Sequence, residues 1–399
     1  MILGVPKEII KNETRVATIP ATVKQFVAAG FTVKVESNAG VLSQISDSDF
    51  KEAGAEILSS ANEVFEQADM ILKVNSPTDE EMAMIKNGSS YLSFFQTMKE
   101  TDKVKSLQSK NVTAYSMHLI PRTTLAQKMD ALSSQTNIAG YKAVIIASCH
   151  IEKYMPLLMT AAGTIKPAKV LILGAGVAGL AAIANAKRMG AQVYAFDVRP
   201  VVKEQVESLG ANFIEVESDS NEGVGEGGYA KEVSEDYKNK QAELIKNTIK
   251  DMDIIISTAL IPERPAPILI DKDMVESMKP GSAIIDLAAI NGGNCELTKC
   301  DEIINHNNII IDGRSYLPST MAQDASQLYS KNLFNLFNHI YNNDNPLNLE
   351  DEITNGSLIL NNGKVNNGYK GHCLLQIHHH EYKSDKALRR AFDFCKYSI

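Results

Sequence analysis

The sequence predicts an α/β fold made of two doubly wound domains, each with a mostly parallel sheet covered by helices, joined by long helices. Short apolar runs alternate with helical stretches in the first third of the chain, and a second series of short apolar runs begins at Lys169. Such βαβ alternation is typical of parallel sheets whose two faces are covered. The length of 399 residues allows two or three domains of ordinary size.

In the first third, Ile19–Ala29 has the apolar spacing of a helix, and Gly30 follows it where a glycine commonly ends a helix. A second helix is expected at Ala61–Gln67. Strands are expected at Met1–Val5, Thr32–Glu36, Asp69–Val74 and Val112–Tyr115. These elements predict the first parallel sheet.

From Ala126 the pattern predicts one long helix, which we expect to connect the two domains. Later strands are expected at Lys169–Leu173, Gln192–Phe196, Asp253–Thr258, Ser282–Leu287 and Asn308–Asp312. Leu328–Ile340 is apolar around most of its circumference, which predicts a buried helix. We therefore expect a discontinuous first domain at 1–125 plus 321–362, a nucleotide-binding domain at 126–320, and an irregular tail at 363–399.

Composition excludes several functions. The 48 acidic residues outnumber the 40 basic ones, so a nucleic-acid partner is not expected.

The five cysteines form no CxxC pair, which indicates free thiols in a reducing compartment. The longest uncharged run, Val170 to Ala186, is shorter than the ~20 residues of a membrane span. Pro6, Lys7 and Glu8 interrupt the apolar stretch that a signal peptide would need, so a cytoplasmic location is expected. No metal site is expected, because His378–His380 has no second ligand cluster at suitable spacing.

A GxGxxG motif formed by Gly174, Gly176 and Gly179 follows the apolar strand Lys169–Leu173 and opens a helix. In a Rossmann-like domain these glycines allow a tight turn, the approach of a pyrophosphate and close helix–strand packing. Asp197 ends the next strand, where a carboxylate can accept both hydroxyls of an adenosine ribose. It favours NAD(H) over NADP(H). Arg199 instead favours NADP(H), because an arginine here can hold a 2′-phosphate. The structural alternative is a glycine-rich turn that binds no ligand.

A polar stripe is expected on one face of the long helix. Its members are spaced three and four residues apart: Gln127, Asp130, Ser133, Ser134 and Asn137. The stripe carries neither Lys nor Glu. Small hydrogen-bonding groups with one carboxylate suit a carboxamide ligand, but a solvated helix face explains the pattern equally well.

Many blocks in order, among them PRTTLAQKMDALSSQTNIAGYKAV, DVRP, GGYAKE and STALIP, resemble the NAD(H)-binding α subunit, or first domain, of proton-translocating NAD(P) transhydrogenases. The likeness runs from VPKE near the start to about Gly356, and the same family includes alanine dehydrogenase. It implies a dimerising subunit that passes hydride from NADH to NADP⁺ on a separate β subunit. It also implies a separate membrane-spanning α component, which would hold this chain on the cytoplasmic face of the inner membrane.

The resemblance also implies site residues. Arg122, Gln127, Asp130 and Ser133 correspond to residues that hold the nicotinamide end, with Gln127 and Asp130 acting by positioning only. Leu125 stands where a second family arginine is usual. Tyr229 matches the tip of a mobile loop, so the glycine-rich Asp219–Gly228 segment is expected to be a lid. The remaining cofactor-binding positions implied are Gly174, Gly176, Val177, Gly179, Asp197, Val198, Arg199, Tyr229, Ala259 and Leu260.

Alanine dehydrogenase is the main alternative. Arg15 and Lys73 resemble residues that hold its substrate, but Gln96 and Ile290 stand where its titrating His and Asp would be. Glutamine and isoleucine cannot accept the proton that oxidative deamination releases. Arg15 and Lys73 are then expected to be inherited structural charges. A non-catalytic NAD-binding module is a third possibility, which would need Asp197 and the glycines but not the polar stripe.

Overall fold

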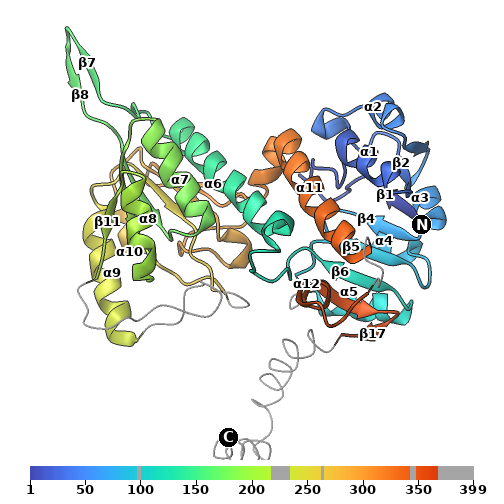
Figure 1. Cartoon of the computed structure of the whole chain (residues 1–399). Coiled ribbons are helices and arrows are strands. Elements are labelled where there is room, and N and C mark those ends of the chain that lie inside the picture. The colour runs from blue at the N-terminus through green and yellow to red at the C-terminus, as the bar shows by residue number, and fades with distance from the viewer. Residues whose placement is uncertain (97–99, 217–233, 262–264, 342–346, 367–399) are drawn as a thin grey trace, which may run out of the picture. The chain divides into compact units, whose positions relative to one another are not determined.

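The computed structural model describes residues 1–96, 100–216, 234–261, 265–341 and 347–366. The chain forms two compact units (Figure 1). Unit 1 contains Met1–Leu132 and the chain from Ala322 on, and unit 2 contains Ser133–Met321. Unit 2 therefore begins at Ser133, whereas the sequence suggests that the nucleotide-binding domain begins at residue 126. The chain leaves unit 1, builds unit 2 and then returns to unit 1.

Unit 1 is built on a sheet whose described strands run in the order β17-β16-β6-β5-β4-β1-β2-β3. Neighbours among β1 to β6 pair in parallel, whereas β16 is antiparallel to both β6 and β17. The strands are β1 (Ile2–Val5), β2 (Thr32–Glu36), β3 (Glu56–Leu58), β4 (Met70–Leu72), β5 (Ser90–Ser93), β6 (Thr113–Ser116), β16 (Leu358–Asn361) and β17 (Lys364–Val365). The helices are α1 (Pro20–Ala28), α2 (Asp47–Glu52), α3 (Ala61–Gln67), α4 (Asp79–Met84), α5 (Thr101–Ser109), α11 (Ala322–Tyr341) and α12 (Glu352–Ser357).

Helix α11 completes the larger core of unit 1. Leu333 and Phe337 are buried in it, and the ring of Phe337 meets that of Phe26 on α1 edge-to-face at a centroid distance of 5.1 Å. The expectation that Leu328–Ile340 forms a buried helix is confirmed. A second cluster, around Tyr91 and Leu107, fills the opposite side of the sheet.

Unit 2 is a mostly parallel sheet in the order β11-β10-β9-β12-β13-β15-β14, in which only β14 among the described strands is antiparallel. The strands are β9 (Lys169–Leu173), β10 (Gln192–Phe196), β11 (Asn212–Ile214), β12 (Ile254–Ser257), β13 (Ala283–Asp286), β14 (Ile303–His306) and β15 (Ile309–Asp312). The helices are α6 (Ala131–His150), which starts in unit 1, α7 (Val177–Arg188), α8 (Lys203–Ser208), α9 (Glu235–Ile249) and α10 (Lys272–Glu276).

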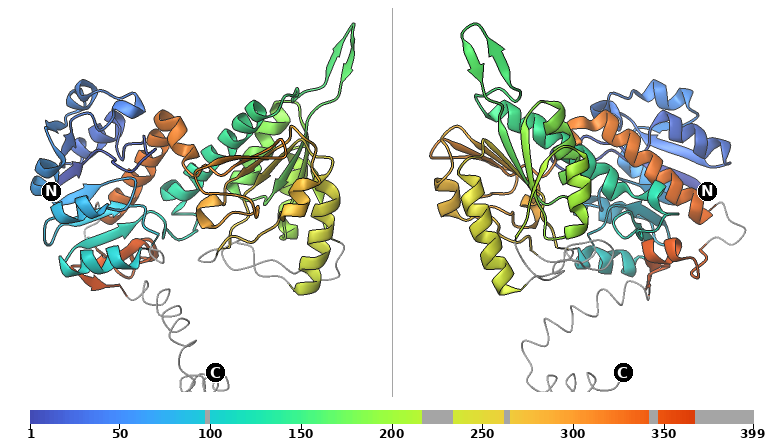
Figure 2. Two further views of the ribbon diagram at one scale, coloured as in Figure 1. Left: turned by 180° about the vertical axis from the view of Figure 1, so that it is seen from behind. Right: turned by 60° about the vertical axis from the view of Figure 1, so that its left-hand side comes forward.

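The sheet of unit 2 is covered on both faces, as the sequence predicts (Figure 2). Val170 and Ile172 of β9 pack with α6, α7 and α8, whereas the alternating Leu171 and Leu173 pack with α9 and α10. Successive strand residues point to opposite faces, so a strand that is apolar throughout needs cover on both. Two doubly wound α/β units are confirmed.

A β-hairpin projects from unit 2 (Figure 1). It consists of β7 (Leu158–Thr160) and β8 (Gly163–Ile165), which among the described strands pair only with each other. Its apolar side chains are largely exposed, including Met159 at 74% and Leu157, just before it, at 54%. An isolated two-stranded hairpin is only marginally stable in water. The hairpin therefore presents apolar surface that the fold of unit 2 does not bury.

Candidate nucleotide site

The glycine-rich turn between β9 and α7 has the geometry that its motif predicts. Gly174 has φ +97°, and a Cβ atom there would lie 2.7 Å from the hydroxyl oxygen of Thr258. A Cβ atom at Gly179 would lie 1.9 Å from the carbonyl oxygen of Gly174. At Gly176 the nearest group to such an atom, at 4.0 Å, is the guanidinium of Arg199. The first and third glycines are thus required by the packing, while the second leaves the start of α7 open.

Helix α7 begins at Val177, with Gly176 as its N-cap and no acidic residue in its first turn; Lys187 and Arg188 lie in its last turn. The amide groups at a helix N-terminus lack partners within the helix and carry a partial positive charge. The start of α7 therefore suits an anion such as a pyrophosphate.

The carboxylate of Asp197 lies at the end of β10, beside this turn, and is buried. Its Oδ2 atom accepts a hydrogen bond from the amide of Ala175 at 2.7 Å. Its Oδ1 atom accepts from the amide of Arg199 at 2.9 Å. The Arg199 side chain adds two more bonds, from Nε to Oδ1 at 2.9 Å and from Nη2 to Oδ2 at 2.8 Å. These side-chain hydrogen bonds raise the pKa of Arg199.

The loop after β12 contains Ala259 and Leu260 and is tied to the same turn. The Thr258 hydroxyl donates to the carbonyl oxygen of Gly174 at 2.9 Å. The side chain of Asn294 holds Ala259 at both polar groups, since its Oδ1 accepts from the Ala259 amide at 3.0 Å and its Nδ2 donates to the Ala259 carbonyl at 2.9 Å. These hydrogen bonds fix the backbone that faces the glycine-rich turn.

Asp286, at the end of β13, organises the loop that carries Asn294. Its fully buried carboxylate accepts hydrogen bonds from three amides and two hydroxyls: Ala288, Asn294, Cys295, Ser257 and Thr298. Thr258, Asp286 and Asn294 are not among the site residues that the sequence predicts. For Thr258 and Asp286 the available signal was a polar residue at the end of an apolar strand, at the edge of a parallel sheet where ligands commonly bind.

The residues expected at the nicotinamide end are distributed between the units. Arg122, Gln127 and Asp130 belong to unit 1, and Ser133 is the first residue of unit 2. Gln127 and Arg122 are exposed, and so is Leu125, at 77%. Val198 is half-buried beside Asp197. Tyr229 and the Asp219–Gly228 segment lie outside the described residues.

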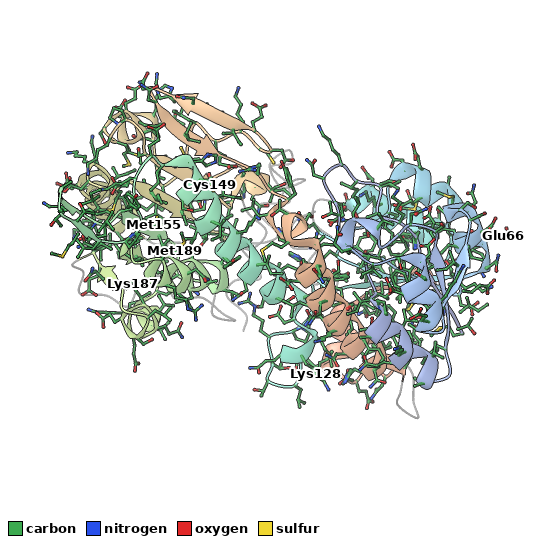
Figure 3. All side chains as sticks on the ribbon, turned by 90° about the horizontal axis from the view of Figure 1, so that it is seen from above. Glu66, Lys128, Cys149, Met155, Lys187 and Met189 are labelled. Atoms are coloured by element: carbon green, nitrogen blue, oxygen red, sulfur yellow. The ribbon has the colours of Figure 1, made fainter. Side chains whose placement is uncertain are left out.

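The expectation that the polar stripe occupies a single helix face is wrong. Gln127 lies in a 3-10 turn, η2 (Gln127–Met129), and Asp130 has ψ 82°, which interrupts the helix before α6 begins at Ala131. Asp is favoured just before a helix because its side chain can accept from the first amides. Asn332 and Asn335 of α11 both donate to the carbonyl of Lys128, at 2.9 and 3.0 Å, so η2 is held against α11 (Figure 3).

The charges that resemble a substrate site in alanine dehydrogenase are paired within unit 1. Glu13 binds the Arg15 guanidinium through two side-chain hydrogen bonds, of 2.8 and 2.6 Å. Lys73 is fully buried between Glu8, at 3.4 Å, and Glu81, which forms the shorter ion pair. Burial raises the pKa of Glu8. This pairing supports the interpretation of Arg15 and Lys73 as structural charges.

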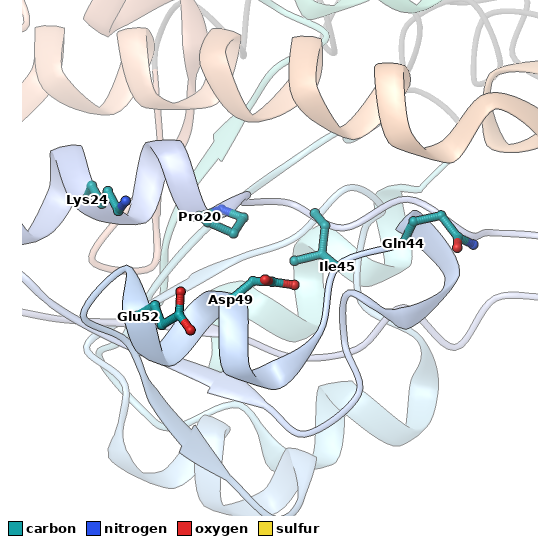
Figure 4. Close-up of a pocket in the computed structure, with 6 residues that line it drawn as sticks. All are labelled: Pro20, Lys24, Gln44, Ile45, Asp49 and Glu52. Carbon is teal, nitrogen blue, oxygen red and sulfur yellow. The ribbon is translucent and has the colours of Figure 1, made fainter.

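Other features of the described residues do not add a second site. A hollow of about 400 Å³ in unit 1 is lined by Pro20, Lys24, Gln44, Ile45, Asp49 and Glu52, none of them an expected site residue (Figure 4). No cluster of metal-ligating side chains occurs among the described residues, and His378–His380 lies outside them. Cys149, Cys295 and Cys300 are not in disulfides there. None of the described helices is both long and apolar enough to cross a membrane.

Two family models match the chain. "Alanine dehydrogenase/PNT, N-terminal domain" matches residues 4–139, and "Alanine dehydrogenase/PNT, C-terminal domain" matches residues 143–368. The chain is 46% identical over 368 residues to NAD(P) transhydrogenase subunit alpha of Haemophilus influenzae, covering 91% of this chain and 71% of that protein. It is 44% identical over 374 residues to the first part of NAD(P) transhydrogenase subunit alpha of Rhodospirillum rubrum, covering 92% of this chain and 97% of that one.

Similarity to alanine dehydrogenases is weaker. The protein of that name from Methanococcus maripaludis is 32% identical over 317 residues, which is 77% of each chain. Among solved structures, a transhydrogenase from Sinorhizobium meliloti superposes with a TM-score of 0.83 at 40% identity, covering 92% of this chain and 100% of that one. An L-alanine dehydrogenase superposes with a TM-score of 0.77 at 24% identity, covering 93% and 98%, which shows a shared fold.

Proposed function

The chain belongs to the alanine dehydrogenase/PNT family, within which it is similar to transhydrogenase α subunits over most of its length, and from this premise we propose that it is the NAD(H)-binding subunit of a proton-translocating NAD(P) transhydrogenase. The observation that carries the proposal is the 44% identity that extends over 97% of the R. rubrum protein named as the first part of subunit alpha. In this proposal the chain binds NADH and a separate β subunit binds NADP⁺.

The geometry of unit 2 fits a dinucleotide. The open backbone at Gly176 and the start of α7 would receive the pyrophosphate, with Gly174 and Gly179 shaping the turn. Asp197 would accept the adenosine ribose, beside Val198 and Arg199. Ala259 and Leu260 would line the dinucleotide from the loop that Thr258 and Asn294 hold in place. The bound NADH supplies the hydride.

The chain's own residues would act by positioning rather than by acid–base chemistry. Gln127 and Asp130 would hydrogen-bond the carboxamide and ribose at the nicotinamide end, with Arg122 and Ser133 beside them. Such bonds fix the distance and face of the ring, and an error of about 1 Å in the reacting geometry can cost about a hundredfold in rate. Tyr229, which lies outside the described residues, would also contribute to cofactor binding. The alanine dehydrogenase reaction is not supported, because Gln96 and Ile290 offer no titrating group.

We infer three partners: a second copy of the chain, the β subunit, and a separate membrane-spanning α component. The hairpin formed by β7 and β8 supports a homodimer, because Met159 and Leu157 expose apolar surface that a second copy would bury. Attachment through the other two partners would place the chain on the cytoplasmic face of the inner membrane and couple hydride transfer to proton translocation.

A reconstitution experiment tests this function. The purified chain is mixed with the NADP(H)-binding domain of a transhydrogenase β subunit, and hydride exchange between NADH and an NADP⁺ analogue is followed by absorbance. Exchange that requires both proteins is the expected result. Tight NADH binding without any exchange would instead indicate a non-catalytic NAD-binding module and would overturn the proposal.

A further inference from the structure

The carboxylate of Asp197 has no hydrogen-bonding capacity left. A carboxylate offers about four lone-pair positions, two on each oxygen. Four donors occupy them here: the amides of Ala175 and Arg199, and the Nε and Nη2 atoms of the Arg199 side chain. The two amides are fixed by the backbone, so the two bonds that can give way are those of the guanidinium.

The charge of Asp197 is also balanced. The Arg199 guanidinium forms an ion pair with it at 2.8 Å, with side-chain exposures of only 14% and 5%. The site is therefore not the bare carboxylate that the sequence alone suggests. Repulsion between Asp197 and a 2′-phosphate is weakened by the adjacent positive charge, and another cause of cofactor preference is needed.

Arg199 lies where a ribose-bound phosphate would come within its reach. Its Nη2 atom is the nearest group, at 4.0 Å, to the position that a Cβ atom would take at Gly176, in the turn proposed to receive the dinucleotide. A guanidinium can bind a phosphate through two parallel hydrogen bonds, and this geometry is stronger and more specific than that of an ammonium group. A carboxylate that already binds the guanidinium through two bonds competes with such a phosphate for the guanidinium.

We propose that Arg199 is a specificity-determining residue of the nucleotide site. Asp197 ties up its guanidinium and so denies it to a 2′-phosphate, whereas the ribose diol of NADH replaces the two guanidinium bonds one for one. Loss of the Asp197 carboxylate would release Arg199 and convert the same turn into a 2′-phosphate site. This inference rests on the proposed NAD(H)-binding function and names the residue pair that sets its selectivity.

The test measures the affinities of NADH and NADPH by fluorescence titration of the whole chain. Asp197→Ala is expected to bind NADPH at least about tenfold more tightly than the unmutated chain, the scale of a gained charge-assisted hydrogen bond. Asp197→Ala/Arg199→Ala should lose that gain. Asp197→Ala/Arg188→Ala should keep it, because Arg188 is an exposed arginine at the other end of α7. Asp197→Asn, which preserves the side-chain shape, replaces Asp197→Ala in each comparison if the alanine variant does not fold.

A gain for NADPH that persists in the Asp197→Ala/Arg199→Ala chain would overturn the proposal, as would the absence of any gain in both single Asp197 variants. These titrations need no β subunit, so they can succeed or fail independently of the hydride-exchange experiment.

Discussion

The hydroxyl group of Thr258 donates a hydrogen bond to the carbonyl oxygen of Gly174 at 2.9 Å, and so joins the loop after β12 to the glycine-rich turn after β9. A Cβ atom at Gly174 would lie only 2.7 Å from the same hydroxyl oxygen. A local sequence motif and a residue more than 80 positions later thus depend on each other for their conformation.

Thr258→Val should remove this bond with little change in shape. We expect a loss of about 1 kcal/mol in the free energy of unfolding, the usual value of one such bond. We also expect weaker NADH binding, because the turn is less well fixed. Thr248→Val is the matched control, since the Thr248 hydroxyl donates to the carbonyl of Leu244 within α9. Urea denaturation should show a similar loss of unfolding free energy for both variants. If Thr258→Val and Thr248→Val bind NADH equally well, the role given to Thr258 is contradicted.

Asp286→Asn should destabilise unit 2 by about 2–3 kcal/mol, because an amide nitrogen would then face amide and hydroxyl donors in a fully buried position. Asp273→Asn, at an exposed position in the first turn of α10, should change the free energy of unfolding by less than about 0.5 kcal/mol. Thermal and urea denaturation of the two variants provide the measurement. A loss below about 1 kcal/mol for Asp286→Asn would mean that the five hydrogen bonds of Asp286 contribute little to the stability of unit 2.

Gln127→Asn and Asp130→Asn should affect hydride transfer more than binding. The adenosine and pyrophosphate end is expected to supply most of the affinity, so NADH binding should stay within about tenfold, or roughly 1.4 kcal/mol. The stopped-flow rate with the β-subunit nucleotide domain should fall much more, because hydride transfer is steep in geometry. Lys128→Ala, an exposed side chain between them, is the control. Collapse of affinity with an unchanged saturated rate would show that both residues only bind.

The chain should lack useful alanine dehydrogenase activity, because Gln96 and Ile290 cannot carry the proton that the reaction requires. The assay is oxidation of NADH with pyruvate and ammonia, alongside a genuine alanine dehydrogenase as positive control. A turnover number of about 1 s⁻¹ or more, the low end for ordinary enzymes, would promote the alternative function.

Glu13 should make stability pH-dependent. Burial by itself would raise its pKa, but the charge and hydrogen bonds of Arg15 outweigh this and lower the pKa to about 2. A group whose pKa is lower in the folded state stabilises it above the unfolded pKa, near ~4.3, and loses that contribution as the pH falls towards ~2. The stability difference between the unmutated chain and Glu13→Gln should therefore shrink by up to about 3 kcal/mol as the pH falls from ~6 towards ~2. Urea denaturation monitored by circular dichroism would reveal it, and a difference independent of pH would exclude this ion pair as its source.

Local pattern was sufficient for much of the fold and for one half of the candidate site. Lys169–Leu173 and Gln192–Phe196 are strands with the expected bounds, because short apolar runs next to a glycine favour buried strands. The helix break at Asp130 was not foreseen, since a single ψ angle changes there within a sequence of helical spacing. Asn294 was missed for a different reason. Its role depends on Ala259, which is 35 residues away, and no short-range pattern encodes that contact.

Unit 2 is one uninterrupted stretch of sequence, whereas the larger core of unit 1 needs Leu333 and Phe337 from α11. During synthesis the ribosome therefore makes all of unit 2 before it makes the helix that closes unit 1. Domains generally fold as units while the chain emerges. The nascent N-terminal segment, with Phe26 and its neighbours, must wait with exposed apolar surface until the return segment arrives, and that interval is when chaperones have most to bind.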